Sequence, residues 1–263
     1  MTGLLAATFE PPSTKDFVFG CRFSLSIGSL DLCFNFIILL LTLTTLFVLA
    51  FFYFGLRKPK VVPGKWQLLT ELGIGFVREN IATPMLGHEA AGFMPLLATF
   101  FFFILFANLF EVIPGFSLSP SSRLAFPFTL AMVSWFTYNI VGIRKHGFFG
   151  YLRHTTIIPE APAILRYGLL MPIEFISNII VRPITLTVRL WANFLAGHFL
   201  LAIFFLGAWF FFQTGGIAYL PGIFSYGLGV VLVAFEIFVA ALQAFIFAVL
   251  SASYIGQAMA EEH

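Results

Sequence analysis

The sequence predicts an all-α integral membrane protein with five membrane-crossing helices and one interfacial helix, whose last two spans form a long, strongly tilted hairpin. Of its 263 residues, 60% are hydrophobic and only 10% are charged, whereas a soluble domain carries about 25% charged residues. Phenylalanine contributes 37 residues, which suits a surface in contact with lipid. Five long apolar stretches follow one another, so residues 34–260 are predicted to form a single polytopic membrane domain.

The first three spans are uncharged stretches bounded by charged residues. They are predicted at about 34–56, 90–113 and 124–143. Each has roughly 20 residues, the length that crosses a hydrocarbon core of about 30 Å. Residues 1–33 then form an N-terminal segment, and residues 261–263 form a C-terminal tail.

The last two spans, at about 167–212 and 223–260, are longer than a bilayer requires. As helices they would measure roughly 65 and 55 Å at 1.5 Å per residue. They must therefore tilt steeply, bend or extend beyond the core. The turn signal between them begins at Gln213 and favours a helical hairpin.

The segment at about 65–86 is too polar to span a membrane, but its leucines and Phe76 recur at roughly helical spacing. An interfacial helix is predicted here, and an ordinary cytoplasmic connector is the alternative. Basic residues are concentrated in the connectors after the first and third spans, whereas the turn at 213–222 has no charge. By the positive-inside rule, the N-terminus lies outside and the C-terminus on the cytoplasmic side.

Global properties exclude some classes of function. The net charge is +2, and no basic run with interleaved aromatic residues indicates a nucleic-acid partner. The N-terminus lacks the basic and apolar regions of a cleaved signal. Cys21 and Cys33 both precede the first span and would pair only if that side of the membrane is oxidising.

Ionisable residues inside the last two spans are the candidate functional residues, because a charge at the centre of a membrane helix costs about 2.5–3.5 kcal/mol. At about 100° per residue, Arg182 and Arg189 share one helix face, and Asn193 lies on nearly the same stripe. His198 points to roughly the opposite side, so Arg189 and His198 are predicted to serve different surfaces. A salt bridge that holds the bundle together is the structural alternative for Arg189.

The other candidates also have structural alternatives. Glu236 and Gln243 are seven residues apart and share one face of the last span, but Glu236 alone would also fit a buried partner of an arginine. The side chain of Arg182 would alternatively extend to the membrane interface. Glu174 would alternatively be an interfacial carboxylate, and His198 would be a hydrogen-bonded histidine of the core.

Three stretches of the sequence form distinctive motifs. From Arg182 to Leu201 the sequence reads RPITLTVRLWANFLAGHFLL, from Glu236 it reads EIFVAALQAFIFAVLSASYI, and residues 107–115 read ANLFEVIPG. These motifs resemble those of one known family, subunit a of the F-type ATP synthase. The similarity runs from about residue 90 to the C-terminus in the expected order.

This resemblance implies six positions for proton translocation: Arg189, Asn193, His198, Glu236, Gln243 and Glu174. Arg189 matches the essential arginine of the family, and Gln243 matches the glutamine that faces it across the helix pair. His198 and Glu236 fall where members place a histidine and a carboxylate in either order. Glu174 resembles an upstream carboxylate, in a less certain register.

The resemblance also implies a mechanism and partners. The chain would be the stator beside a rotating c-ring, whose mid-membrane carboxylates are protonated in lipid and ionise beside Arg189. Because arginine stays protonated, it would prevent a proton short-circuit between two half-channels. His198 and Glu236 are expected to line one half-channel, and Glu174 lies nearer the cytoplasmic mouth of the other. Subunit b of the peripheral stalk, the F1 head and membrane lipid are the further implied partners.

By this interpretation the chain is not an enzyme on its own and needs no cofactor or metal. Its expected location is the bacterial plasma membrane, and the mitochondrial inner membrane is the alternative.

Two other functions fit the same spans. A stand-alone channel or secondary transporter often shows an internal repeat, and none is evident. A structural subunit of a respiratory complex would lose no proton flux on substitution of Arg189. The transported ion and the ring stoichiometry depend on the ring.

Overall fold

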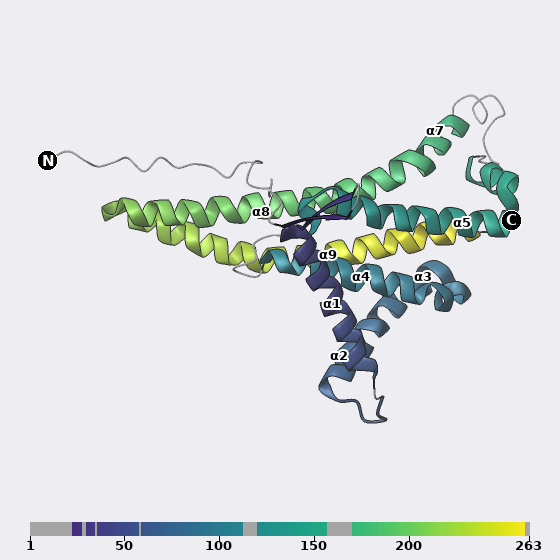
Figure 1. Cartoon of the computed structure of the whole chain (residues 1–263), viewed down its shortest axis with the longest axis horizontal. Coiled ribbons are helices and arrows are strands. Elements are labelled where there is room, and N and C mark those ends of the chain that lie inside the picture. The colour runs from purple at the N-terminus through teal and green to yellow at the C-terminus, as the bar shows by residue number, and fades with distance from the viewer. Residues whose placement is uncertain are drawn as a thin grey trace.

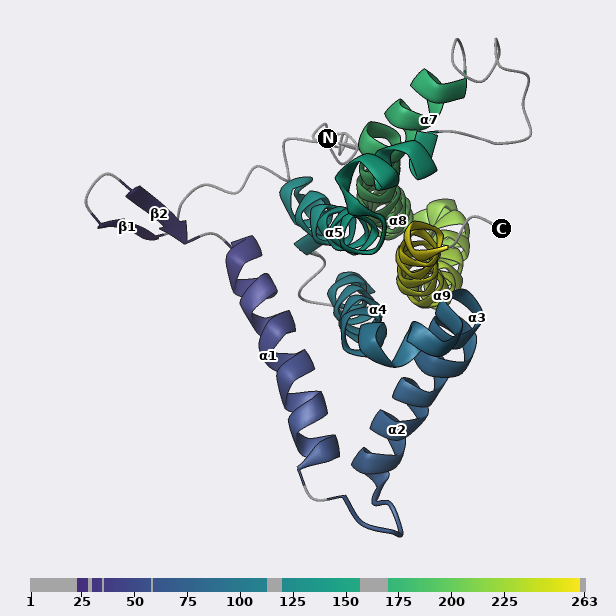
Figure 2. The ribbon, with the colours of Figure 1, turned by 90° about the vertical axis from the view of Figure 1, so that its right-hand side faces the viewer.

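The structure is a computed structural model of the whole chain, and it describes residues 23–27, 30–34, 36–57, 59–112, 120–156 and 170–260. In the described ranges, five helical segments are long and apolar enough to cross a membrane, which confirms the predicted class. Figure 1 shows a long helical hairpin, formed by α8 (Arg182–Thr214) and α9 (Tyr219–Met259), that runs the length of the molecule. It lies beside α4 (Ala90–Val112) and α5 (Ala125–Thr156). Helix α1 (Phe36–Leu56) runs across this bundle (Figure 2).

A short β-hairpin precedes the first helix, in the region predicted only as an N-terminal segment. Strand β1 (Phe23–Ile27) pairs antiparallel with β2 (Leu30–Phe34). Apolar and polar residues alternate in β1, FSLSI, which is the period of a strand. The possible pairing of Cys21 with Cys33 lies outside the described residues, because Cys21 does.

Helix α1 (Phe36–Leu56) is followed by a helical segment where the interfacial helix was predicted. This segment consists of α2 (Lys65–Val77), the π-turn η2 (Arg78–Ala82) and α3 (Thr83–Leu86). It ends at the 3₁₀ turn η3 (Gly87–Glu89), in which Gly87 has a positive φ of 53°. Because glycine adopts this conformation readily, the chain can reverse direction there and enter the next helix.

Helices α4 (Ala90–Val112) and α5 (Ala125–Thr156) both pack against α9, and the short 3₁₀ turn η4 (Pro120–Ser122) precedes α5. Helix α5 is kinked at Gly147, which has φ 72°. After the kink, Tyr151 packs against the surface of Gly142, where a Cβ would overlap its ring. The predicted third span thus continues into a segment that folds back on its own end.

The fourth span consists of α7 (Met171–Ile176), the π-turn η6 (Ser177–Val181) and α8 (Arg182–Thr214). The span was predicted as one tract, and the π-turn within it was not predicted. Gly215 and Gly216, both with positive φ, reverse the chain before the 3₁₀ turn η7 (Gly216–Ala218). Helix α9 (Tyr219–Met259) then runs back along α8.

The core lies between α4, α5, α8 and α9. Phe100 and Phe247 meet there with ring centroids 5.3 Å apart. On α9 the buried positions are mostly small, among them Ala244, Ala248 and Ala252. Small residues let helix backbones approach closely in membranes, so this end of α9 is held tightly against its neighbours.

Candidate functional site

The register of the α8–α9 hairpin determines which candidate residues lie at the same level. Glu236 of α9 lies against Gly197 of α8, where an added Cβ would overlap its carboxylate. Nearer the turn, Ser225 Oγ of α9 donates a hydrogen bond of 2.8 Å to the carbonyl oxygen of Phe204. The two contacts show that α8 and α9 are antiparallel and pack together between these two levels. Positions along one helix can therefore be matched to positions along the other.

Arg189 lies on the outer face of α8. Its side chain is exposed, as are those of its neighbours Val188 and Ala192. In the described part of the chain its guanidinium makes no hydrogen bond and no ion pair. The structural alternative of an internal salt bridge is therefore not seen among the described residues. Since an unpaired charge is costly in a membrane helix, this face of α8 is the place where a partner of opposite charge is expected.

The register of the hairpin also gives the level of Gln243. Gln243 follows Glu236 by seven residues along α9, and Leu190 precedes Gly197 by seven residues along α8. Extending the Gly197–Glu236 contact along the two antiparallel helices therefore places Gln243 opposite Leu190, the neighbour of Arg189. Its side chain is only 6% exposed, and its amide Nε2 has no hydrogen-bond partner among the described residues. The proximity of Gln243 to Arg189 stays a prediction. Asn193, half-buried, lies one turn further along α8.

Glu236 and His198 occupy a second level of the hairpin. Glu236 is 6% exposed and contacts Gly197. His198 is the residue that directly follows Gly197 along α8. The His198 ring is half-buried and stacks on Phe194, with centroids 5.7 Å apart. The structure therefore brings the carboxylate and this segment of α8 together. His198 is less accessible than Arg189, as expected if the two side chains serve different surfaces.

Glu174 does not join either level. It lies in α7, on the far side of the π-turn from Arg189, and its side chain is half-buried. Glu174 precedes Arg189 by fifteen positions, which correspond to roughly 22 Å of helix. Glu174 is thus placed toward the end of the bundle that is opposite the hairpin turn.

Sequence reasoning missed a polar cluster at that same end. Arg182 Nη2 donates a hydrogen bond of 2.9 Å to Gln257 Oε1, and its guanidinium lies 4.5 Å from the ring centroid of Tyr254. Tyr254 packs edge-on against Tyr138, whose hydroxyl donates to the carbonyl oxygen of Asn178 at 2.8 Å. Arg182 is therefore held within the protein and does not simply extend to the interface. Only the hairpin register, which pairs the start of α8 with the end of α9, would have indicated these partners.

The described residues contain no group of three or more histidine, cysteine, aspartate or glutamate side chains arranged to hold a metal ion. Among the candidate residues, Arg189 and Glu236 place ionisable groups on two adjacent helices of an apolar bundle. This arrangement is typical of multi-pass membrane proteins that move ions.

Comparison with known proteins identifies the particular family. The model of the ATP synthase A chain family matches residues 37–256. ATP synthase subunit a of Rhodococcus erythropolis is 41% identical over 266 residues, covering all of this chain and 95% of the relative. The same subunit of a Nocardioides species is 38% identical, covering 97% of this chain and 95% of the relative. The chain belongs to the family of ATP synthase subunit a.

Family membership defines the activity at the level of the complex. The chain is the non-catalytic proton-channel stator subunit of an F-type ATP synthase, and it takes part in proton transport and ATP synthesis as a membrane subunit of that complex. It is a multi-pass membrane protein whose relatives are bacterial. A stand-alone channel or transporter and a structural subunit of a respiratory complex are no longer the best interpretations.

Proposed function

We propose that Arg189 separates two proton half-channels on the face of α8 that contacts a rotating c-ring. The observation that carries this proposal is the exposed guanidinium, which has no hydrogen bond or ion pair among the described residues. A ring carboxylate that passes this face would ionise beside the arginine and be protonated again in lipid. Because the guanidinium keeps its proton, it would repel protons without relaying them.

His198 and Glu236 are the proposed lining of the half-channel on the outer side. Glu236 is buried beside Gly197, so its carboxyl group belongs to the protein interior and not to the lipid surface. An imidazole and a carboxyl group at one level are suited to hold a mobile proton. Asn193 and Gln243 would supply polar groups between this pair and Arg189. The buried amide of Gln243, which lacks a partner in the described chain, supports a polar path there.

Glu174 is the proposed carboxylate of the inner half-channel. Its position at the end of the bundle away from the hairpin turn supports this role. In the proposed orientation, the N-terminus and the hairpin turn lie outside the bacterial plasma membrane and the C-terminus lies in the cytoplasm. Helix α1 runs across the bundle in Figures 1 and 2. If the axis of α1 lies along the membrane normal, α8 and α9 therefore cross the bilayer at a steep tilt. Subunit b and the F1 head are the further proposed partners.

The experiment that tests this proposal is ATP-driven acidification of inverted membrane vesicles. Arg189→Ala should leave the complex assembled but abolish acidification. Val188→Ala changes an exposed neighbour on the same face of α8 and is the matched control, expected to retain acidification. Acidification that survives in the Arg189→Ala complex would refute the proposed barrier.

A further inference from the structure

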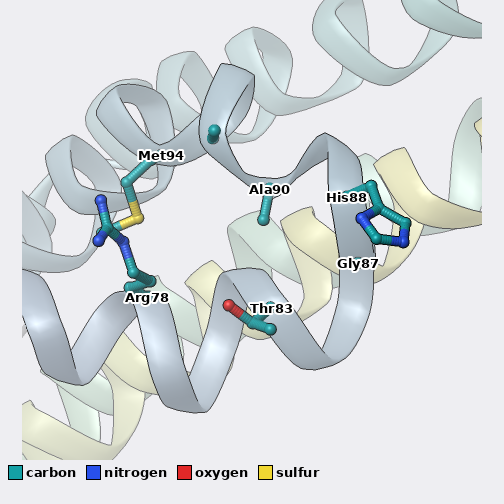
Figure 3. A pocket seen from close by; sticks show the side chains of 7 residues that line it. Arg78, Thr83, Gly87, His88, Ala90 and Met94 are labelled. Atoms are coloured by element: carbon teal, nitrogen blue, oxygen red, sulfur yellow. The ribbon is translucent and has the colours of Figure 1, made fainter.

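A cavity of about 200 Å³ lies at the elbow between η2, α3 and the start of α4, and none of its lining residues is among those assigned to the proton path. Its lining combines cationic, hydroxyl and small side chains: Arg78, Thr83, Gly87, His88, Ala90, Ala91 and Met94. Figure 3 shows Arg78 reaching toward Met94 from the opposite helix, with Thr83 and His88 toward the turn. The elbow therefore brings polar groups from three consecutive elements around one hollow.

Local sequence explains why the hollow exists. Gly87, at φ 53°, turns the chain sharply, and no atom lies within 4 Å of where its Cβ would be. Ala90 and Ala91 begin α4 with the smallest side chains, so the first turn of that helix does not fill the space. Buried Met94 closes the floor. A bulky residue at 90 or 91 would remove the cavity without changing the helices.

The chemistry of the lining fits a phosphate group. Arg78 is exposed, and within the described ranges its guanidinium makes no hydrogen bond or ion pair. A guanidinium presents a planar set of donors that matches phosphate oxygens two at a time. The hydroxyl of Thr83 adds a further donor on the same hollow, and His88 lies at the turn beside it. No carboxylate lines it.

The position of the cavity points to a lipid as the source of that phosphate. The segment before it exposes Leu68, Leu69 and Leu72, which form one apolar arc of α2. Arg78 lies about 200° around the helix from Phe76, which is on that arc, and so lies on the polar side. In a helix at a membrane surface, the apolar arc faces acyl chains and the polar side faces headgroups. The placement at the surface rests on the interfacial helix predicted at about 65–86.

We propose that this cavity binds the phosphate of an anionic phospholipid headgroup in the leaflet that contacts α2. The acyl chains would lie along the apolar arc of α2, and the headgroup phosphate would accept hydrogen bonds from Arg78 and Thr83. Such a lipid would fill the elbow between the interfacial segment and α4.

Photolabelling of the intact complex tests this assignment. The complex is reconstituted in phosphatidylcholine vesicles that carry a phosphatidylglycerol with a photoreactive headgroup, and labelled peptides are identified by mass spectrometry. Label is expected in the peptide that contains residues 78–94. Arg78→Gln should reduce it by about tenfold, the effect of losing one charge-assisted contact. Arg57→Gln, which removes another exposed cation from the same connector, should leave it unchanged.

Competition distinguishes the source of the phosphate. Unlabelled phosphatidylglycerol should displace the label, whereas phosphatidylcholine and inorganic phosphate should not. Displacement by inorganic phosphate or equally by phosphatidylcholine would overturn the lipid assignment, and so would equal labelling of wild type and Arg78→Gln. Absence of label in the wild-type complex would also overturn it, as expected if a carboxylate of a neighbouring subunit fills the cavity.

Two variants keep this test separate from folding and from the proton path. Arg78→Lys retains the charge but not the paired donors, so it should assemble and show intermediate labelling. Arg189→Ala tests the proposed proton barrier and does not touch the cavity, so its complex should be labelled as wild type is. Loss of pumping and loss of labelling can therefore occur independently.

Discussion

The carboxylate of Glu236 lies directly against Gly197, in the space that any other side chain at position 197 would occupy. The contact joins α8 to α9 at the level of His198, the next residue along α8. A buried acid in an apolar bundle needs room and polar neighbours, and the glycine provides the room. The glycine within the AGH portion of the α8 motif is thus explained by the acid on the opposite helix.

Gly197→Ala should therefore impair proton transport without preventing assembly. The added methyl group overlaps Glu236 and must displace it, and overpacking of this kind costs about 1–3 kcal/mol. We expect the rate of ATP-driven acidification per assembled complex to fall roughly tenfold, because small displacements of a reacting group have large effects on rate. Gly207→Ala is the matched control, since its Cβ would lie 3.6 Å from Ser225 Oγ, an ordinary contact. Equal loss in both variants would contradict the assigned role of this glycine.

Glu236→Gln removes the ionisable group while keeping the shape of the side chain. We expect passive proton flux through vesicles stripped of the soluble head to fall by about tenfold or more, because an amide cannot accept and release a proton in relay. The amount of assembled complex should change little. Glu79→Gln, which neutralises an exposed acid of η2 outside the α8–α9 hairpin, controls for the loss of one negative charge. Unchanged flux in Glu236→Gln would argue against its place in the half-channel.

The spans and the candidate residues were predictable because both depend on local properties. The length and apolarity of a span are dictated by the bilayer, and a charge such as that of Arg189 is conspicuous in any apolar helix. The contact of Gly197 with Glu236 and that of Arg182 with Gln257 were not predictable, because they depend on the register between helices. The β-hairpin was missed although FSLSI alternates as a strand does, since five residues are a weak signal beside long apolar helices.

A buried pair of hydroxyls joins α5 to α9 and offers a test of packing in the bundle. Ser134 Oγ donates to Ser251 Oγ at 2.9 Å, and both side chains are fully buried. Ser134→Ala should lower the thermal stability of the purified complex, because one hydroxyl is left unpaired; interhelical hydrogen bonds in membranes contribute about 0.6 kcal/mol on average. The double variant with Ser251→Ala should be no less stable than the single variant, since no unpaired group remains. A further, additive loss in the double variant would show that the two hydroxyls do not act as a pair.

Arg182 should act with Gln257 and Tyr254 to fix the end of the hairpin farthest from the turn. Its hydrogen bond to Gln257 is charge-assisted, and the ring of Tyr254 lies under the guanidinium. Replacing Arg182 by glutamine should therefore destabilise the complex by about 1–2 kcal/mol at this partly exposed site. A double-mutant cycle with Gln257→Ala, measured by thermal unfolding in mild detergent, should give a coupling free energy of roughly 1 kcal/mol. Tyr254→Phe keeps the ring and should retain the coupling, whereas Tyr254→Leu should weaken the binding of the guanidinium. Strictly additive effects of the Arg182 and Gln257 substitutions would mean that the contact does not stabilise the hairpin, and the end of α8 would then be held by the π-turn and α5 alone.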